Sequence, residues 1–136
     1  MRRFYLVSLF IMTTSIYYQG VPGAYSHIVG NHFAKTLDTR SIIGLSNFTA
    51  IFEAIKESGL GIVPIENSYA GAVYENYFNL AKYDVRIYAE YFLPVCHCLA
   101  ACSSEKNTIK KIFSHYQALM QTDTYTRLHG WTTESY

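Results

Sequence analysis

Two polar turns, each directly after a short apolar run, carry residue types that could bind an anion. The small, hydroxyl and amide residues of these turns are Ala24, Tyr25, Ser26, Asn67 and Ser68. Backbone N–H groups in such turns, together with small hydroxyls, form binding sites for carboxylates and phosphates. Two such turns in one chain predict a site for a small molecule that carries more than one negative group.

Each group in these turns has a structural interpretation beside the functional one. Asn67 and Ser68 are expected to contact the ligand, and the alternative is that they cap the helix that follows. Residues 24–26 are expected to form the facing wall, and the alternative is a tight turn that packs strand on helix. Glu66 could be a general acid if its pKa were raised. We favour a structural hydrogen-bond acceptor, because a carboxylate would repel an anionic ligand.

The elements that position these turns alternate between strand and helix. Residues 25–35 have apolar positions at helical spacing, and residues 61–65 are nearly all apolar, as in a buried parallel strand. Residues 85–101, with Pro94 inside, predict two extended segments or a crossing between lobes. The other strands are expected at 16–19, 41–45 and 111–114, and the other helices at 48–58, 73–82 and 115–129.

This order predicts an α/β fold with a parallel sheet. Ligands of such sheets bind beyond the carboxyl ends of the strands, and both polar turns lie at such ends. The element order therefore places the predicted anion site at one edge of the sheet.

Length and charge restrict the class of protein. The chain has 136 residues, enough for about one domain, with 11 Lys+Arg against 10 Asp+Glu. The sequence contains no basic stripe of the kind that would indicate a nucleic-acid partner. The apolar run 4–12 after Arg2 and Arg3 is too short to span a membrane, and it resembles a signal peptide without the usual cleavage site. We expect residues 1–14 to be an N-terminal extension or signal-like segment, with residues 1–11 outside the fold, and residues 15–136 to be a cytoplasmic domain.

Three cysteines cluster around one histidine. Cys96, Cys98 and Cys102 are an odd number at close spacing, which is a poor disulfide framework. With His97 they suggest a metal site only weakly, because neighbouring side chains of a strand point to opposite faces and the other ligands of a zinc site are missing. We expect buried structural thiols in a reducing compartment and no bound metal.

Four segments resemble, in order and spacing, motifs of the prephenate dehydratase family. They begin at Gln19, Pro64, Leu93 and Ser114 and read QGVPGAYS, PIENSYAG, LPVCHCL and SHYQAL. The last has Tyr116 where the family has proline. Each motif alone is weak evidence, but the ordered set is specific, and the resemblance covers about residues 15–129.

The resemblance implies a fold, a reaction and a set of site residues. It implies a two-lobed fold like type II periplasmic binding proteins, with a first lobe at about 15–90, an incomplete second lobe at about 91–130, and the active site between the lobes. It implies decarboxylating dehydration of prephenate to phenylpyruvate in phenylalanine biosynthesis, a lyase reaction without metal or organic cofactor. His97 and His115 match family motifs, and we expect both to be satisfied core residues. The resemblance leaves open whether the chain forms a homo-oligomer.

One departure from the family concerns catalysis. The family's catalytic threonine lies in a late Thr-Arg-Phe motif, which this chain does not contain. Thr126-Arg127-Leu128 is similar only superficially, and we interpret it as helix surface. Residues 131–136 do not resemble the family and are expected to be an altered tail. We therefore expect this chain alone to have little or no dehydratase activity, with its catalytic residues unknown. The alternatives are a non-catalytic module that binds an aromatic carboxylate and an inactive gene fragment.

Overall fold

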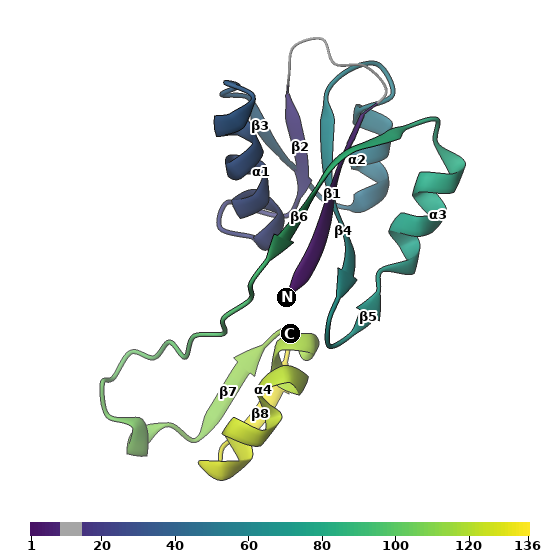
Figure 1. Cartoon of the computed structure of the whole chain (residues 1–136). Helices are drawn as coiled ribbons and strands as arrows, with labels where there is room; N and C mark the ends of the chain where they lie inside the picture. The colour runs from purple at the N-terminus through teal and green to yellow at the C-terminus, as the bar shows by residue number, and fades with distance from the viewer. Residues whose placement is uncertain (9–14) are drawn as a thin grey trace. The chain divides into compact units, whose positions relative to one another are not determined.

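A computed structural model describes residues 1–8 and 15–136 of the chain. The chain divides into two compact units, Met1–Pro94 and Val95–Tyr136 (Figure 1). We call them the first and second units and describe each by itself.

A mixed sheet forms the centre of the first unit. The strand order is β3-β2-β4-β1-β6, with the short β5 paired to β4. β2 is parallel to β3 and β4, whereas β1 is antiparallel to β4 and β6. The strands are β1 (Arg2–Ser8), β2 (Ile16–Gln19), β3 (Ile42–Leu45), β4 (Leu60–Asn67), β5 (Gly71–Ala72) and β6 (Arg86–Leu93).

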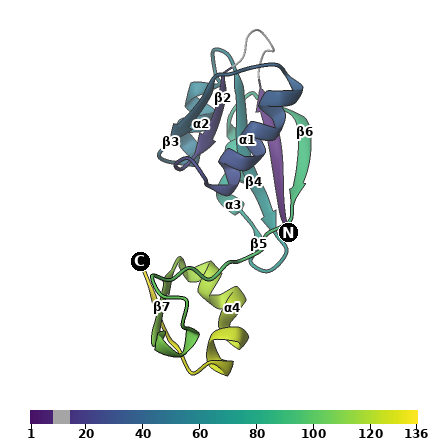
Figure 2. The same ribbon diagram turned by 90° about the vertical axis from the view of Figure 1, so that its left-hand side faces the viewer.

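Three helices cover the two faces of this sheet: α1 (Tyr25–Thr36), α2 (Phe48–Ala54) and α3 (Tyr74–Lys82). Val29 and Phe33 of α1 pack in one buried cluster with apolar side chains of β1, β2 and β4. Ile51 and Phe52 of α2, with Tyr83 just after α3, form a second cluster on the other face. Figure 2 shows α1 in front of the sheet, with α2 and α3 behind it. The alternating strand–helix order predicted for residues 16–82 is confirmed, and so is the α/β class.

The N-terminal segment is part of the sheet, so the expectation that residues 1–11 lie outside the fold is wrong for residues 2–8. Strand β1 lies between β4 and β6, and Phe4, Leu6 and Val7 are fully buried. Residues 4–7 of the apolar run that resembled a signal peptide instead have the pattern of a strand buried on both faces. Residues 9–14 lie outside the described part of the chain.

Strand β4 is longer than its apolar run predicts. The expected end was Ile65, because Glu66-Asn67-Ser68 has the composition of a turn. Partner strands extend it: Arg2 and Arg3 of β1 pair with Asn67 and Glu66, and β5 pairs with the same two residues. Asn67 is therefore the last residue of a strand.

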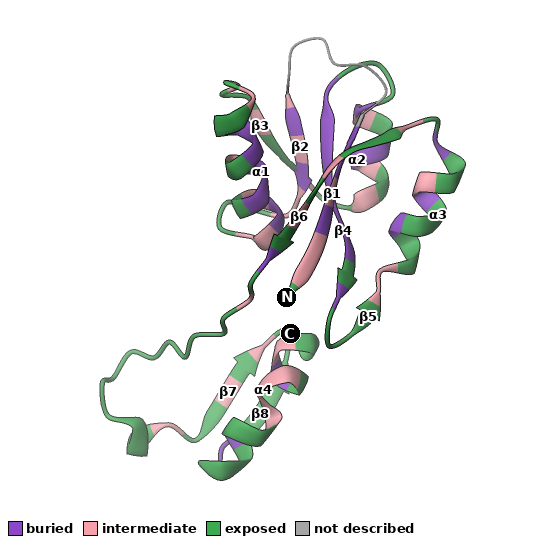
Figure 3. Cartoon of the chain, viewed as in Figure 1, coloured by how far each residue is buried: buried purple, intermediate pink, exposed green. Residues whose placement is uncertain are grey.

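The second unit is small and has a thin core. Its elements are a short 3-10 helix at Lys106–Thr108, β7 (Lys111–Ser114), α4 (Tyr116–Leu128) and β8 (Thr132–Ser135). β7 and β8 pair in parallel. Its buried residues are Leu119, Thr126 and Trp131, and exposed residues prevail in this unit in Figure 3.

The structure corrects two expectations for this region. Residues 95–101 form no strand, so the alternative of two extended segments over 85–101 is wrong beyond Leu93, whereas the alternative of a crossing between lobes is not contradicted. The expected tail at 131–136 contains β8, because Trp131 packs into the core and the residues after it pair with β7. Among the described residues, no helix has the length and apolar character that a bilayer crossing requires.

Candidate functional site

The first predicted turn leads directly into α1. Gly20 and Gly23 have φ of 106° and 95°, values that glycine adopts without strain. Ala24 is the N-cap, and its N–H donates to the Val21 carbonyl at 3.0 Å. No side chain caps α1, and its first turn contains no acidic residue. The positive end of the helix dipole is therefore not neutralised by the helix's own side chains.

Tyr25 and Ser26 are less accessible than predicted. Ser26 is only 6% exposed, and Tyr25 is partly buried against the cluster on the α1 face. The structure thus places both residues at the start of the helix, as predicted. Direct contact between the Ser26 hydroxyl and a ligand stays a prediction.

Asn67 organises the second turn. Its side chain is 7% exposed, and its Oδ1 accepts hydrogen bonds from the N–H groups of Tyr69 at 2.9 Å and Ala70 at 3.4 Å. The alternative that Asn67 and Ser68 cap the next helix is wrong, because α3 begins at Tyr74 with Val73 as its N-cap. Asn67 instead holds the backbone of its own turn.

Ser68 and Glu66 lie beside the start of β1. The Ser68 Oγ accepts a hydrogen bond from the Met1 amino group at 3.0 Å, and the Ser68 N–H donates to the Met1 carbonyl at 3.1 Å. The exposed Glu66 has its Oε2 at 4.0 Å from Nη1 of Arg3, which is an ion pair and too long for a hydrogen bond. These residues and Phe92 line a hollow of about 60 Å³, so a role for Glu66 as a catalytic acid has no buried surroundings to support it.

Arg2 connects the two turns. Its Cα pairs with that of Asn67 across β1 and β4, and its guanidinium carbon lies 4.6 Å from the centroid of the Tyr25 ring. Its Nε is buried without a hydrogen-bond partner, and none of the ion pairs among the described residues includes Arg2. Burial lowers the pKa of the Arg2 guanidinium, and the electrostatic interaction with Tyr25 opposes this shift. The site therefore contains a cation without a counter-ion.

Reasoning from the sequence missed Arg2, although a signal was present. Arg3-Phe4 matches the last two residues of the Thr-Arg-Phe motif, with Arg2 at the position of the threonine. We looked for that motif only near the end of the chain, because it lies late in the family's dehydratase domain. The strand position of residues 2–8 became visible only through their pairing with β4 and β6.

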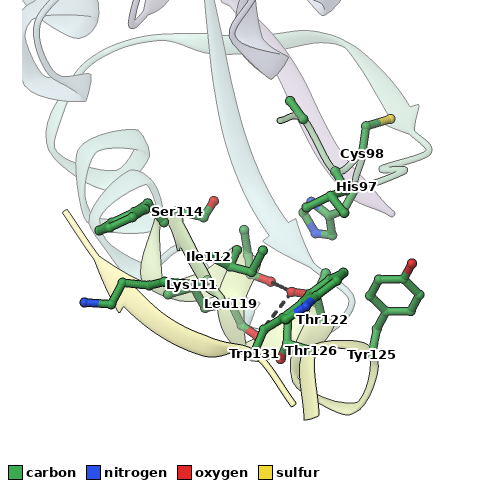
Figure 4. A pocket seen from close by; sticks show the side chains of 14 residues that line it. His97, Cys98, Lys111, Ile112, Ser114, Leu119, Thr122, Tyr125, Thr126 and Trp131 are labelled. Atoms are coloured by element: carbon green, nitrogen blue, oxygen red, sulfur yellow. Dashed lines mark hydrogen bonds between the residues drawn. The ribbon is translucent and has the colours of Figure 1, made fainter. Parts of the chain in front are cut away.

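A larger cavity lies within the second unit. It has a volume of about 510 Å³ and is lined by residues of β7, α4 and the segment 97–100, with Trp131 (Figure 4). Thr126 is buried at its wall, so the interpretation of Thr126 as helix surface is wrong, whereas the exposed Arg127 fits it. The hydroxyls of Thr122 and Thr126 donate to backbone carbonyls of α4 at 2.8 and 2.9 Å. Both hydroxyl groups therefore use their donor protons in hydrogen bonds to the helix backbone.

The two motif histidines are exposed, so the expectation that they are core residues is wrong. His97 Nε2 lies 2.6 Å from Gln121 Oε1, and His115 is the N-cap of α4, accepting from the Gln117 N–H at 3.3 Å. Both side chains have local structural partners in the second unit.

The cysteines are also exposed, which contradicts the expected buried thiols. Cys96, Cys98 and Cys102 are free and exposed because residues 95–101 form no strand that could turn one face inward. Within the described ranges, no group of three or more His, Cys, Asp or Glu side chains is arranged to hold a metal ion.

Comparison with known proteins identifies the family. The family profile described as "Prephenate dehydratase" matches residues 16–136. The match includes the last six residues, so the expectation that residues 131–136 do not resemble the family is wrong. Residues 2–8, including Arg2, lie outside it.

Curated relatives and a solved structure agree with this match. The chain is 34% identical to a prephenate dehydratase of Methanocaldococcus jannaschii, over 91% of the chain and 46% of that protein. It is 34% identical to arogenate dehydratase 5, chloroplastic, of Arabidopsis thaliana, over 82% of the chain and 26% of that protein. The crystal structure of a Staphylococcus aureus prephenate dehydratase is similar in fold, with a TM-score of 0.66, 20% identity and coverage of 90% of this chain and 47% of that one.

The chain thus spans between about a quarter and just under half of the length of these relatives. The four ordered motifs, the mixed α/β fold and the profile match over residues 16–136 lead to one conclusion. The chain belongs to the prephenate dehydratase family.

Proposed function

We propose that this chain binds prephenate and serves its decarboxylating dehydration to phenylpyruvate in phenylalanine biosynthesis. The observation that carries this proposal is the placement of the two polar turns after the adjacent parallel strands β2 and β4, with Arg2 between them. Ligands of α/β sheets bind at this edge. The family match and the names of the relatives support the choice of substrate.

The chemistry of prephenate suits a site rich in positive charge and N–H donors. Prephenate carries two carboxylates and one ring hydroxyl. The bond from the ring to one carboxylate breaks and that group leaves as carbon dioxide. The electron pair of the bond enters the ring, and the bond from the ring to the hydroxyl breaks. Hydroxide leaves as water after it takes a proton, and the ring becomes aromatic. The protein has to hold the carboxylates and to assist the leaving hydroxyl.

The groups of the first unit supply the binding part of this task. The uncapped start of α1, at Tyr25 and Ser26, presents main-chain donors, and Arg2 presents a guanidinium. We propose Asn67 and Ser68 as polar contacts on the opposite side of the ligand. We assign no residue as the proton donor.

A second candidate is a module that binds an aromatic carboxylate without catalysis. Glu66 is the carboxylic acid of the two turns, and it lies exposed beside Arg3. This surrounding does not favour the protonated form that a general acid requires.

We propose a small-molecule ligand, no nucleic-acid or membrane partner, and a cytoplasmic location. The nearly balanced charge supports the absence of a nucleic-acid partner, and the names of the relatives support a small-molecule ligand. Imaging of a tagged chain in its source cells tests the location, and light scattering tests whether a homo-oligomer forms.

Calorimetry and a product assay on the full chain test the proposal together. We expect prephenate to bind with heat that saturates at one site, and phenylpyruvate to accumulate at most slightly faster than in buffer alone, because the chain lacks the family's catalytic threonine. A parallel assay with arogenate measures phenylalanine and tests the substrate named for several relatives. Binding without turnover would favour the non-catalytic module. Absence of binding for both compounds would refute the proposed function.

A further inference from the structure

Two neighbouring arginines of β1 have opposite surroundings. Arg3 Nε lies 3.1 Å from the Glu90 carboxylate, and its Nη1 lies 4.0 Å from Glu66. Arg2, one position earlier, points to the other side of the strand and contacts the Tyr25 ring. Among the described residues, Arg2 has no carboxylate partner.

The unpaired state of Arg2 is costly. A guanidinium stays ionised in proteins, and a buried donor without a partner loses the hydrogen bond that water would supply. The Nε atoms of Arg2 and Arg3 are both shielded from solvent without a well-formed hydrogen bond, but Arg3 Nε has the Glu90 carboxylate at 3.1 Å, whereas Arg2 Nε has no acceptor. The face of the Tyr25 ring stabilises the cation in part. An anion would satisfy both the charge and the open donor.

The position of Arg2 says where that anion would lie. Pairing with Asn67 fixes Arg2 beside the second turn, and the contact with Tyr25 fixes its guanidinium at the start of α1. A planar guanidinium binds a carboxylate through two parallel hydrogen bonds. We propose that Arg2 is a ligand-binding residue whose guanidinium pairs with a carboxylate of the bound aromatic acid. This inference rests on the proposed function for the identity of that acid, and it assigns the contact to a strand outside the family match.

A comparison of Arg2 with an arginine away from the turns tests the proposal. Prephenate is titrated calorimetrically into the wild-type chain, Arg2→Gln, Arg2→Lys and the control Arg86→Gln in β6. Loss of a charged hydrogen-bonding group costs about 10- to 100-fold in affinity, so we expect a loss in this range for Arg2→Gln. Arg2→Lys keeps the charge but not the paired geometry and should lose less. Arg86→Gln should change affinity less than about threefold, since Arg86 is exposed and lies at the end of β6 away from Arg2.

A second measurement on the wild-type chain separates this inference from the proposed substrate. Phenylpyruvate, a monocarboxylate, is titrated while the Nε–H resonance of Arg2 is followed by NMR. Because this experiment uses the wild-type chain, it tests the role of Arg2 even if the Arg2→Gln variant fails to fold. A shift of that resonance on titration supports the carboxylate contact even if prephenate does not bind, in which case only the proposed substrate fails. Prephenate binding that is equal in all four chains would overturn the role of Arg2 and leave the proposed function in place. No shift of the resonance and no binding of either compound would overturn both.

Discussion

Replacement of Leu6 by alanine tests whether the N-terminal segment is a strand of the sheet. Leu6 is fully buried in the cluster on the α1 face, in a strand that pairs with both β4 and β6. The change removes three carbons from this cluster. At about 0.8 kcal/mol per buried CH₂ group, the lost transfer free energy is about 2.4 kcal/mol. A cavity term raises the expected loss in the free energy of unfolding to about 3–5 kcal/mol.

Urea and thermal unfolding followed by far-UV circular dichroism measure this loss. For a unit of this size, about 3 kcal/mol lowers the midpoint temperature by roughly 12–24 °C. The single tryptophan, Trp131, lies in the second unit, so its fluorescence follows that unit separately.

The control is Ile87→Ala in β6, whose side chain is 51% exposed although its backbone pairs with β1. It should cost less than about 0.5 kcal/mol. If Leu6→Ala is as stable as the wild-type chain within that same margin, residues 2–8 are not a buried strand. The placement of Arg2 beside Asn67, which depends on the pairing of β1 with β4, would then be unsupported.

Four further substitutions test the packing and electrostatics of the first unit. A Cβ at Gly61 would lie 2.6 Å from a side chain of α2, so Gly61→Ala should cost about 1–3 kcal/mol. Gly30 lies inside α1, where an added Cβ would make only ordinary contacts, so Gly30→Ala should stabilise by up to about 1 kcal/mol. Urea midpoints compare the two variants. Asn76→Ala removes the buried 2.8 Å hydrogen bond from its Nδ2 to the Pro64 carbonyl and should cost about 1–3 kcal/mol in the same experiment; an unchanged midpoint would contradict this contact. Hydrogen bonds from a lysine and a tyrosine lower the pKa of Glu53 from its ordinary 4.5. The contribution of Glu53 to stability is therefore present above pH 4.5 and is lost as the pH falls through the lower folded-state pKa. Glu53→Gln should flatten this part of the stability–pH curve, and a curve of unchanged slope would refute the assignment.

The local pattern of the sequence predicted much of the first unit. Apolar spacing located the helices after residues 24 and 47, and the apolar run at 61–65 located the central parallel strand. These signals are reliable because the apolar side chains of each helix or strand pack against a buried core at the spacing of that element. The two polar turns were predicted in the same way, from residues that follow a strand end.

Burial in the second unit could not be predicted in that way. Cys96 and Cys98 are apolar in composition and were expected inside, yet they are exposed because no strand forms around them. Thr126 is polar and was expected outside, yet it is buried beside Trp131 in a small core. In each case the neighbours in space, and not those in sequence, decide the accessibility.

The sequence by itself determined the family and the two turns, because both depend on residues that stand close together along the chain. Only the tertiary structure decided that residues 2–8 join the sheet and that Arg2 lies between Asn67 and Tyr25. The physical reason is the long separation of the partners: strand pairing joins residues 65 positions apart, and no local pattern specifies which strand edge a short apolar run will pair with. The proposed anion site therefore combines turns that the sequence predicts with a cation that the fold supplies.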